Sequence, residues 1–295
     1  MMPRINARRV LLSLCVAAGL AVATPAAASG LRHGLLWKVS GHGAATPSWL
    51  FGTIHSSDPR VTRLTPKLRR IFDHSSSYSM ELIFNGTGFV DMAQAMYLPD
   101  GQTLKSLIGP NLYERIHTTL TSLGLPTDDL DHKKPWAVIL SLGTPHRSQG
   151  LFLDLMLQVR ATLQMKPTYG LETMAEQIAV FNDMPMADQI ALLRDSLRTR
   201  EGSGQEMADL MQAYLHHNLG KLYAISQRMR SHSGRSYAEL MDRMLVQRNR
   251  RMLNRIQPRL REGNAFIAVG ALHLAGPNGL VALLRHQGYR VQAVN

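Results

Sequence analysis

The sequence predicts an α/β (α+β) fold, with a central mixed β-sheet built from both chain ends and a large, mostly helical insertion between them. Strand-like apolar runs occur near the start and near the end of the chain. Between them, residues from about 89 to 261 form amphipathic stretches separated by Pro and Gly. From residue 265 onward the pattern returns to strand–helix–strand order. Strands alternating with helices at the two ends favour a shared sheet.

The first elements are predicted to be a β-hairpin and a short helix. Apolar runs at 35–39 and 48–51 flank a glycine-rich turn at 41–47, which is typical of two antiparallel strands. A helix is predicted over about 65–73, with Pro66 at its first position, where its missing N–H is no loss.

A third strand is predicted over 77–82, before the helical insertion, which a short β-prone run at 166–170 interrupts. The final segment predicts a strand at 265–269, then a helix from about 278 to 286 and a last strand at 289–294. Both ends of the chain therefore supply strands to one sheet.

A short pattern occurs twice, each time at the end of a predicted strand. Gly52 is followed three residues later by His55, and Gly270 is followed in the same way by His273. A glycine lets the backbone turn sharply there. If the two strands are parallel neighbours, both imidazoles emerge at the edge where open α/β sheets bind ligands. The repetition indicates a metal or acid/base site, although either histidine could instead cap a helix or satisfy a buried carbonyl.

Residues 1–28 are predicted to be an export signal that is removed after Ala28. Three arginines precede a short apolar run at 10–22, and small residues follow it. The run is shorter than the about 20 residues of a membrane span, so no transmembrane segment is expected after cleavage. The only cysteine, Cys15, lies in this segment, which excludes disulfides, thiolate ligands and a cysteine nucleophile from the mature chain, residues 29–295. The expected location is periplasmic or secreted.

The chain is strongly basic. Its formal charge of +12 falls to +9 when the three arginines of the export signal are lost. In an exported protein this charge favours contact with an anionic envelope polymer or lipid headgroups, or serves solubility. Nucleic-acid binding is not expected, because the chain is exported and only 6% of its residues are aromatic.

Several sequence pieces together resemble one known family. They are Leu36-Trp37-Lys38-Val39, Phe51-Gly52-Thr53-Ile54-His55, Glu81, Leu153-Asp154, Gly170-Leu171-Glu172-Thr173, Gln177, Arg248-Asn249, and Ala268-Val269-Gly270-Ala271-Leu272-His273-Leu274-Ala275-Gly276. In their order and spacing they resemble the TraB/GumN family, which includes the TIKI metalloproteases and is distantly similar to erythromycin esterases.

The resemblance implies a metal-dependent hydrolase with His55, His273 and Glu81 at its centre. Two neutral imidazoles and a carboxylate can hold a divalent cation and leave positions open for water. Manganese, cobalt and zinc all suit such nitrogen and oxygen ligands. Glu81 is either the third ligand or the general base, or else a carboxylate paired with a cation at the sheet edge. The chain departs from the family pattern at two places. Gln247 stands where relatives often have an acid, and Glu81 is followed by Leu82-Ile83 rather than by Leu-Asp.

Two further charged residues are candidates for the site. Glu172 follows a β-prone run and is a second ligand or base, or else a carboxylate at the start of the next helix. Arg248 is predicted to pair with Glu81 or Glu172, or to hold a substrate carboxylate or oxyanion. Most of the nearby arginines, which are Arg250, Arg251 and Arg255, are expected to form a solvated helix face.

Two polar residues are expected to support the site. Asn249 would assist Arg248 by hydrogen bonding. Asp154 is the lone acid in an apolar helical run, where it either orients a histidine or forms a polar stripe with Gln158.

The expected function is cleavage of a peptide or amide bond in an extracytoplasmic peptide or protein substrate. One alternative is a non-catalytic envelope protein that binds polysaccharide or peptide. Another is metal-free hydrolysis in the manner of erythromycin esterases, with a histidine as general base. The chain contains no G-x-S-x-G elbow, which argues against a serine hydrolase of the α/β-hydrolase type.

Overall fold

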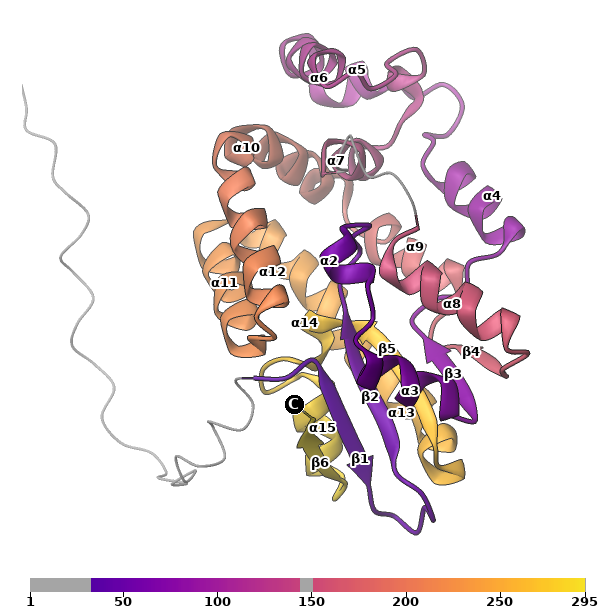
Figure 1. The fold of residues 1–295 in the computed structure, drawn as a ribbon. Helices are drawn as coiled ribbons and strands as arrows, with labels where there is room; N and C mark the ends of the chain where they lie inside the picture. The colour runs from indigo at the N-terminus through magenta and orange to yellow at the C-terminus, as the bar shows by residue number, and fades with distance from the viewer. Residues whose placement is uncertain (1–32, 144–150, 295) are drawn as a thin grey trace, which may run out of the picture.

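The computed structural model describes residues 33–143 and 151–294. Their strands form one six-stranded sheet in the order β4-β3-β5-β2-β1-β6 (Figure 1). The strands are β1 (Leu36–Ser40), β2 (Ser48–Thr53), β3 (Ser77–Met80), β4 (Thr168–Gly170), β5 (Ala265–Gly270) and β6 (Arg290–Ala293). The predicted export signal, residues 1–28, lies outside the described residues.

The sheet is mixed, as the sequence predicts. β1 pairs antiparallel with β2, which confirms the hairpin, and antiparallel with β6. β2, β5, β3 and β4 run parallel to one another. The central strand β5 is buried along residues 265–269, as expected for a parallel strand covered on both faces. The prediction of a sheet built from both chain ends is therefore confirmed.

Helices account for most of the remaining chain. They are α2 (Pro59–Thr62), α3 (Pro66–His74), α4 (Gly86–Ala95), α5 (Leu104–Ile108), α6 (Pro110–Ser122), α7 (Pro135–Gly143), α8 (Leu153–Leu163), α9 (Met174–Asn182), α10 (Met186–Leu215), α11 (Leu219–His232), α12 (Arg235–Met241), α13 (Arg248–Glu262), α14 (Ala271–Leu274) and α15 (Leu280–His286). A 3-10 turn at Leu130–His132 and a π-helical stretch at Asp242–Gln247 complete the set. The predicted helical insertion corresponds to α4 through α13, interrupted by β4.

Element ends differ from the predictions by a few residues. The third strand stops at Met80 rather than at residue 82, so Glu81 lies just after it. The last helix begins at Leu280, because Gly279 stands at its N-cap position. Helix α3 begins at Pro66, and the Thr65 side chain accepts a hydrogen bond from the Leu68 N–H. These shifts reflect local caps and leave the architecture unchanged.

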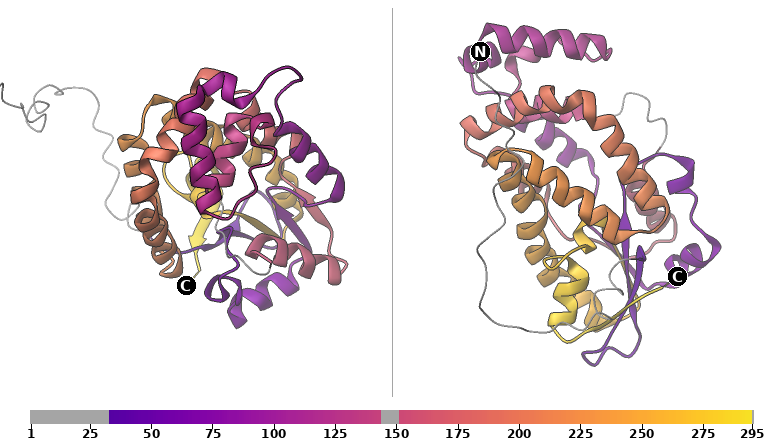
Figure 2. Two further views of the ribbon diagram at one scale, coloured as in Figure 1. Left: turned by 90° about the horizontal axis from the view of Figure 1, so that it is seen from above. Right: turned by 90° about the vertical axis from the view of Figure 1, so that its left-hand side faces the viewer.

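The sheet lies between helices. Helix α3 lies on one side of it, with α13 and α15 on the other (Figures 1 and 2). Helices α5, α6 and α7 lie beyond the carboxyl ends of the parallel strands. The main core surrounds the sheet, where the Phe266 ring contacts the rings of Phe51, Phe72 and Tyr78. A second apolar cluster holds together α5, α6 and α7 and includes Leu104, Ile116 and other residues of the insertion.

Gly52, the penultimate residue of β2, lies beneath a closely packed helix. A Cβ at this position would lie 2.9 Å from Leu274 Cδ1 and 3.1 Å from Ala271 Cα. The Cα belongs to backbone that cannot turn aside as a flexible side chain does. A side chain here would therefore push α14 away from the sheet.

We expect Gly52→Ala to lower the free energy of unfolding by about 1–3 kcal/mol, because it overpacks this contact. Urea denaturation measures the change. The control is Gly86→Ala, since a Cβ at Gly86 would meet no atom within 4 Å. Equal stability of the two variants would contradict the close packing of α14 on β2.

None of the helices in the described part of the chain is long and apolar enough to span a membrane.

Candidate active site at the carboxyl edge of the sheet

The two glycine–histidine motifs end neighbouring parallel strands. Thr53 of β2 pairs with Gly270 of β5, so both motifs emerge at the same edge of the sheet. The motifs are offset by one residue, since Gly52 pairs with Val269. The histidines consequently differ in environment. The His273 side chain on α14 is 5% exposed, whereas the His55 side chain in the loop after β2 is 64% exposed.

Hydrogen bonds fix the tautomer of His273. The Asn249 amide donates from Nδ2 to the Asn278 carbonyl at 2.7 Å, so its Oδ1 faces His273 Nδ1, also at 2.7 Å. An amide oxygen only accepts, and Nδ1 must therefore carry the proton. Nε2 is left with its lone pair, 3.6 Å from Glu81 Oε1. Burial lowers the pKa of His273 to about 4, which keeps the ring neutral at pH 7.

His55 is oriented by Asp154 on α8. His55 Nδ1 lies 3.0 Å from Asp154 Oδ2, while Thr53 Oγ1 donates to Asp154 Oδ1 at 2.6 Å. The hydrogen bond with Asp154, opposed by desolvation, raises the pKa of His55 above its usual value. As in His273, an oxygen acceptor engages Nδ1, so Nε2 is the nitrogen available to a ligand or substrate.

Glu81 follows β3 and lies between the two motifs. Its Oε1 accepts a 2.6 Å hydrogen bond from the Gly270 N–H, and its Oε2 accepts one from Arg248 Nη2 at 2.5 Å. Burial alone would raise the pKa of Glu81, but His273, Arg248 and the Gly270 N–H together lower it to about 2. Glu81 is therefore ionised at neutral pH.

Arg248 bridges two buried carboxylates. It stands where the π-helical stretch Asp242–Gln247 passes into α13, and wide turns of this kind are frequent at functional sites. Besides Glu81, it contacts Glu172, with Nε 2.8 Å from Oε2. Arg251 Nη1 lies 3.0 Å from the other Glu172 oxygen. Glu172 is thus engaged by two arginines and serves to hold Arg248 in place.

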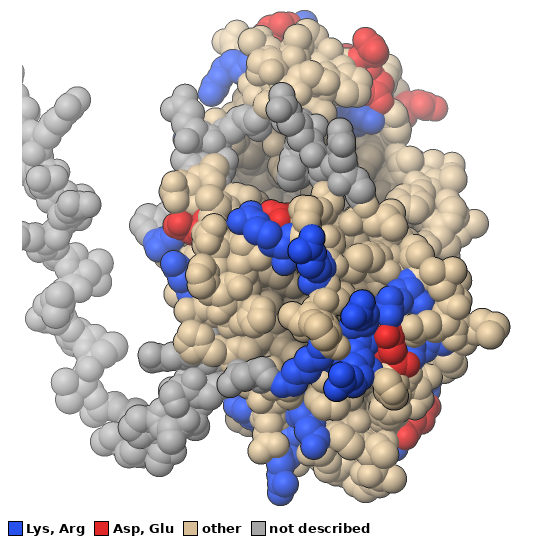
Figure 3. Space-filling view, in the orientation of Figure 1, with Lys and Arg blue, Asp and Glu red and all other residues tan. Residues whose placement is uncertain are grey.

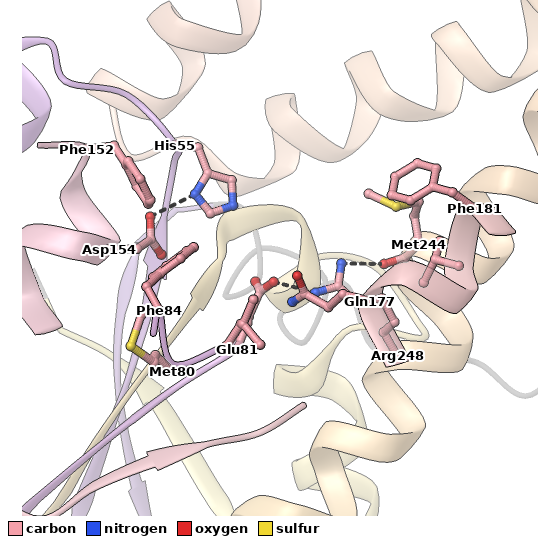
Figure 4. A pocket seen from close by; sticks show the side chains of 12 residues that line it. His55, Met80, Glu81, Phe84, Phe152, Asp154, Gln177, Phe181, Met244 and Arg248 are labelled. Carbon is pink, nitrogen blue, oxygen red and sulfur yellow. Dashed lines mark hydrogen bonds and ion pairs between the residues drawn. The ribbon is translucent and has the colours of Figure 1, made fainter. Parts of the chain in front are cut away.

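A cavity of about 360 Å³ opens beside these residues. His55 and Asp154 lie on one side of it and Arg248 on the other, with Glu81 between them (Figure 4). The rest of its wall is mainly apolar and comprises Met80, Leu82, Phe84, Phe152, Gln177, Val180, Phe181 and Met244. An apolar pocket with a few convergent polar groups is the usual form of a ligand site.

The donor atoms suit a divalent cation in part. His273 Nε2 and Glu81 Oε1, 3.6 Å apart, are at a separation that two ligands on one ion can adopt, because each bond is about 2.0–2.2 Å long. Within residues 33–143 and 151–294, no three His, Asp or Glu side chains form a ready metal-binding group. The pair therefore fits a metal ion, and a third protein ligand would have to come from the exposed His55.

The predicted site residues converge at one edge of the sheet. His55, Glu81, Asp154 and Arg248 line the cavity, and His273 lies directly behind Glu81. The other predicted residues surround these. Asn249 contacts His273, Glu172 contacts Arg248, and the two glycines lie near the carboxyl ends of β2 and β5. Asn249 contacts His273 rather than supporting Arg248 as expected. Asp154 takes the histidine-orienting position and Gln158 bonds elsewhere, to the Phe84 backbone.

Several residues of the site are not among the predicted ones. Thr53, buried and bonded to Asp154, lies inside the first glycine–histidine motif, and that position was an available signal. The aromatic cavity walls, such as Phe84 and Phe152, come from separate segments and carry no common pattern.

Another ion pair, between Glu176 and Arg255, lies next to the pair of Arg251 and Glu172. Glu176 at the start of α9 accepts hydrogen bonds from Arg255 at 2.6 and 2.7 Å. These bonds, assisted by the Thr173 N–H, lower the pKa of Glu176 to about 2. A carboxylate whose pKa is lower in the folded state stabilises the fold above the unfolded pKa of about 4.3, and this contribution is lost as the pH falls toward 2.

We expect Glu176→Gln to lower the thermal midpoint at pH 7, with a deficit that shrinks between about pH 5 and pH 2. The loss should stay near 1 kcal/mol or below, because the Arg255 side chain is 39% exposed. Thermal unfolding across this pH range measures it, with the exposed Glu114→Gln as control. A deficit that grows on acidification would contradict the assignment.

Known proteins match this chain over most of its length. A family model, TraB/PrgY/gumN family, matches residues 35–293. Metalloprotease TIKI1 of Danio rerio is 26% identical over 313 residues, covering 88% of this chain and 63% of the relative. Metalloprotease TIKI2 of Xenopus tropicalis is 26% identical over 314 residues, covering 88% and 60%. Metalloprotease TIKI1 of Homo sapiens is 24% identical over 316 residues, covering 88% and 62%.

The chain thus spans about three fifths of the length of these curated relatives. No solved structure matches it significantly. The family model covers nearly the whole described fold, from β1 near one end of the chain to β6 near the other. The chain belongs to the TraB/PrgY/gumN family.

Proposed function

We propose that this chain is an exported, metal-dependent hydrolase that cleaves a peptide or amide bond in an extracytoplasmic peptide or protein. The observation that carries the proposal is the pairing of the unprotonated His273 Nε2 with the ionised Glu81 carboxylate, 3.6 Å apart beside an apolar cavity. The relatives described as metalloproteases support the same chemistry.

His273 and His55 would hold the ion, which is manganese, cobalt or zinc, and Glu81 would be either the third ligand or the general base. When bound, the ion would lower the pKa of a water molecule and polarise the substrate carbonyl. Asn249 and Asp154 hold the two imidazoles with Nε2 available.

Arg248 would stabilise negative charge on the substrate. It lines the cavity and its guanidinium is fixed between Glu81 and Glu172, so little ordering is needed when an oxyanion forms. A carboxylate at the end of a substrate would bind the same group. Glu172 acts by positioning Arg248 rather than as ligand or base.

The proposed export rests on the basic and apolar pattern of residues 1–28, and an exported enzyme would meet its substrate in the periplasm or outside the cell. The positive charge of the mature chain would favour an anionic envelope polymer near the enzyme.

A second candidate function is hydrolysis without a metal. His55, with Asp154 on Nδ1 and an exposed ring at the cavity, has the geometry of a general base oriented by a carboxylate. An activity that resists chelators but is lost in His55→Ala would favour it.

The metal content of the purified protein tests the main proposal. We expect one equivalent of manganese, cobalt or zinc in the wild type and in His286→Ala, an exposed histidine on α15 that serves as control. His273→Ala and His55→Ala should each lose the ion while circular dichroism reports an unchanged fold.

Two results would contradict the proposal. One is a wild-type protein that takes up none of the three ions after reconstitution with each. The other is full retention of the ion by both His273→Ala and His55→Ala, which would mean that the metal binds elsewhere.

A further inference from the structure

A second cavity, of about 340 Å³, shares no lining residue with the candidate active site. It lies between the β1–β2 hairpin, helices α2 and α3, and the end of α10. Its walls are largely apolar and comprise Leu35, Leu36, Phe51, Val61, Leu64, Leu68, Tyr214, Leu215 and Val294. Most of these side chains are buried or half-buried, so the cavity is recessed into the protein.

The remaining lining residues are mainly basic. Arg60, Arg63, Lys67 and His217 belong to the cavity wall, and all four are exposed, whereas no Asp or Glu lines it. Figure 3 shows basic side chains gathered on this face of the molecule. Arg60 is paired with Asp58 at 2.6 Å, so part of the charge is already compensated. The cavity thus has an apolar interior and a positive rim.

The polar groups inside the cavity are already satisfied by protein partners. Tyr214 donates its hydroxyl to the Gly52 carbonyl at 3.1 Å. Thr65 accepts from the Leu68 N–H as the cap of α3. A ligand that needed hydrogen bonds deep in the cavity would find few, whereas a hydrocarbon chain would gain from burial at about 25 cal/mol per Å².

We propose that this cavity binds a fatty acid, with the acyl chain among the leucines and the carboxylate at the basic rim. Charge complementarity selects this occupant: a neutral hydrocarbon would make no use of the basic rim, and an anion without a chain would leave the apolar walls empty. A guanidinium and an ammonium are suitable partners for a carboxylate at the mouth of such a site.

Isothermal titration calorimetry on the purified, delipidated protein tests the proposal with three probes. Dodecanoate is expected to bind at one site. Dodecanol has the same chain without the charge and should bind about tenfold more weakly, as expected for the loss of a charge-assisted contact. Acetate has the charge without the chain and should give no detectable heat.

A pair of charge-matched variants places the site. Arg63→Glu/Lys67→Glu changes two rim residues and should weaken dodecanoate binding by at least about tenfold. Arg69→Glu/Arg70→Glu makes the same charge change on α3, the helix that carries Lys67, at exposed residues outside the cavity wall, and should keep the affinity within about twofold. Circular dichroism checks that both variants fold.

Four results would overturn the proposal. The first is no binding of dodecanoate, and the second is equal binding of dodecanoate and dodecanol. The third is an equal loss of dodecanoate affinity in the two double variants, which would indicate a general electrostatic effect of the basic face rather than a site. The fourth is sedimentation with anionic phospholipid vesicles without binding of monomeric dodecanoate, which would assign the basic face to a membrane surface.

Discussion

Arg248→Met is expected to lower the free energy of unfolding by about 3–5 kcal/mol, because it leaves two buried carboxylates without their shared cation. The Arg248 side chain is 7% exposed, and those of Glu81 and Glu172 are 11% and 0% exposed. Methionine preserves much of the volume, so the loss would come from uncompensated charge. Urea denaturation at pH 7 measures the effect.

The control for this prediction is Arg255→Met on the same helix. Arg255 is 39% exposed and paired with the partly exposed Glu176, so its removal should cost about 1 kcal/mol or less. The double variant Arg248→Met/Glu172→Gln should recover part of the loss, because it removes one of the two carboxylates that lose Arg248. If Arg248→Met were no more harmful than Arg255→Met, Arg248 would not be the cation that allows Glu81 and Glu172 to be buried.

The sheet could be predicted because its evidence is local. The apolar runs of β2 and β5, each ended by a glycine, read as strands without knowledge of their partners. Their parallel pairing then places both histidine motifs at one edge. The boundaries of α3 were likewise set by local chemistry, the cap at Thr65 and the proline that follows it.

The site was harder to predict because its contacts join distant segments. Asn249 was expected to assist its neighbour Arg248, but consecutive helix residues point in different directions, and Asn249 reaches His273 instead. Arg251 and Arg255 were expected in a solvated face. Their side chains are 33% and 39% exposed, and they also bind Glu172 and Glu176 from another part of the chain. Pairings of this kind depend on how α13 packs, which no local pattern specifies.

The second large effect is expected at Asn249, and it depends on the proposed metal site. Asn249→Leu should weaken metal binding by about 10–100-fold, the usual effect of losing a partner that orients a ligating histidine. Without the amide oxygen, His273 Nδ1–H has no acceptor, and the proton can move to Nε2, which then offers no lone pair. Metal titration measures the affinity, and nitrogen NMR of the imidazole reports the tautomer in the metal-free protein.

Two variants sharpen this prediction. Asn249→Asp keeps an acceptor for Nδ1 and should retain the affinity, since a carboxylate serves well in this position. Asn254→Leu makes the same polar-to-apolar change at an exposed residue of α13 and should alter neither the affinity nor the tautomer. If the His273 proton moved to Nε2 in Asn249→Leu without loss of metal affinity, Asn249 would be shown to set the tautomer of His273. The same result would show that His273 is not a metal ligand. An unchanged tautomer would instead show that the packing of α14 alone orients the ring.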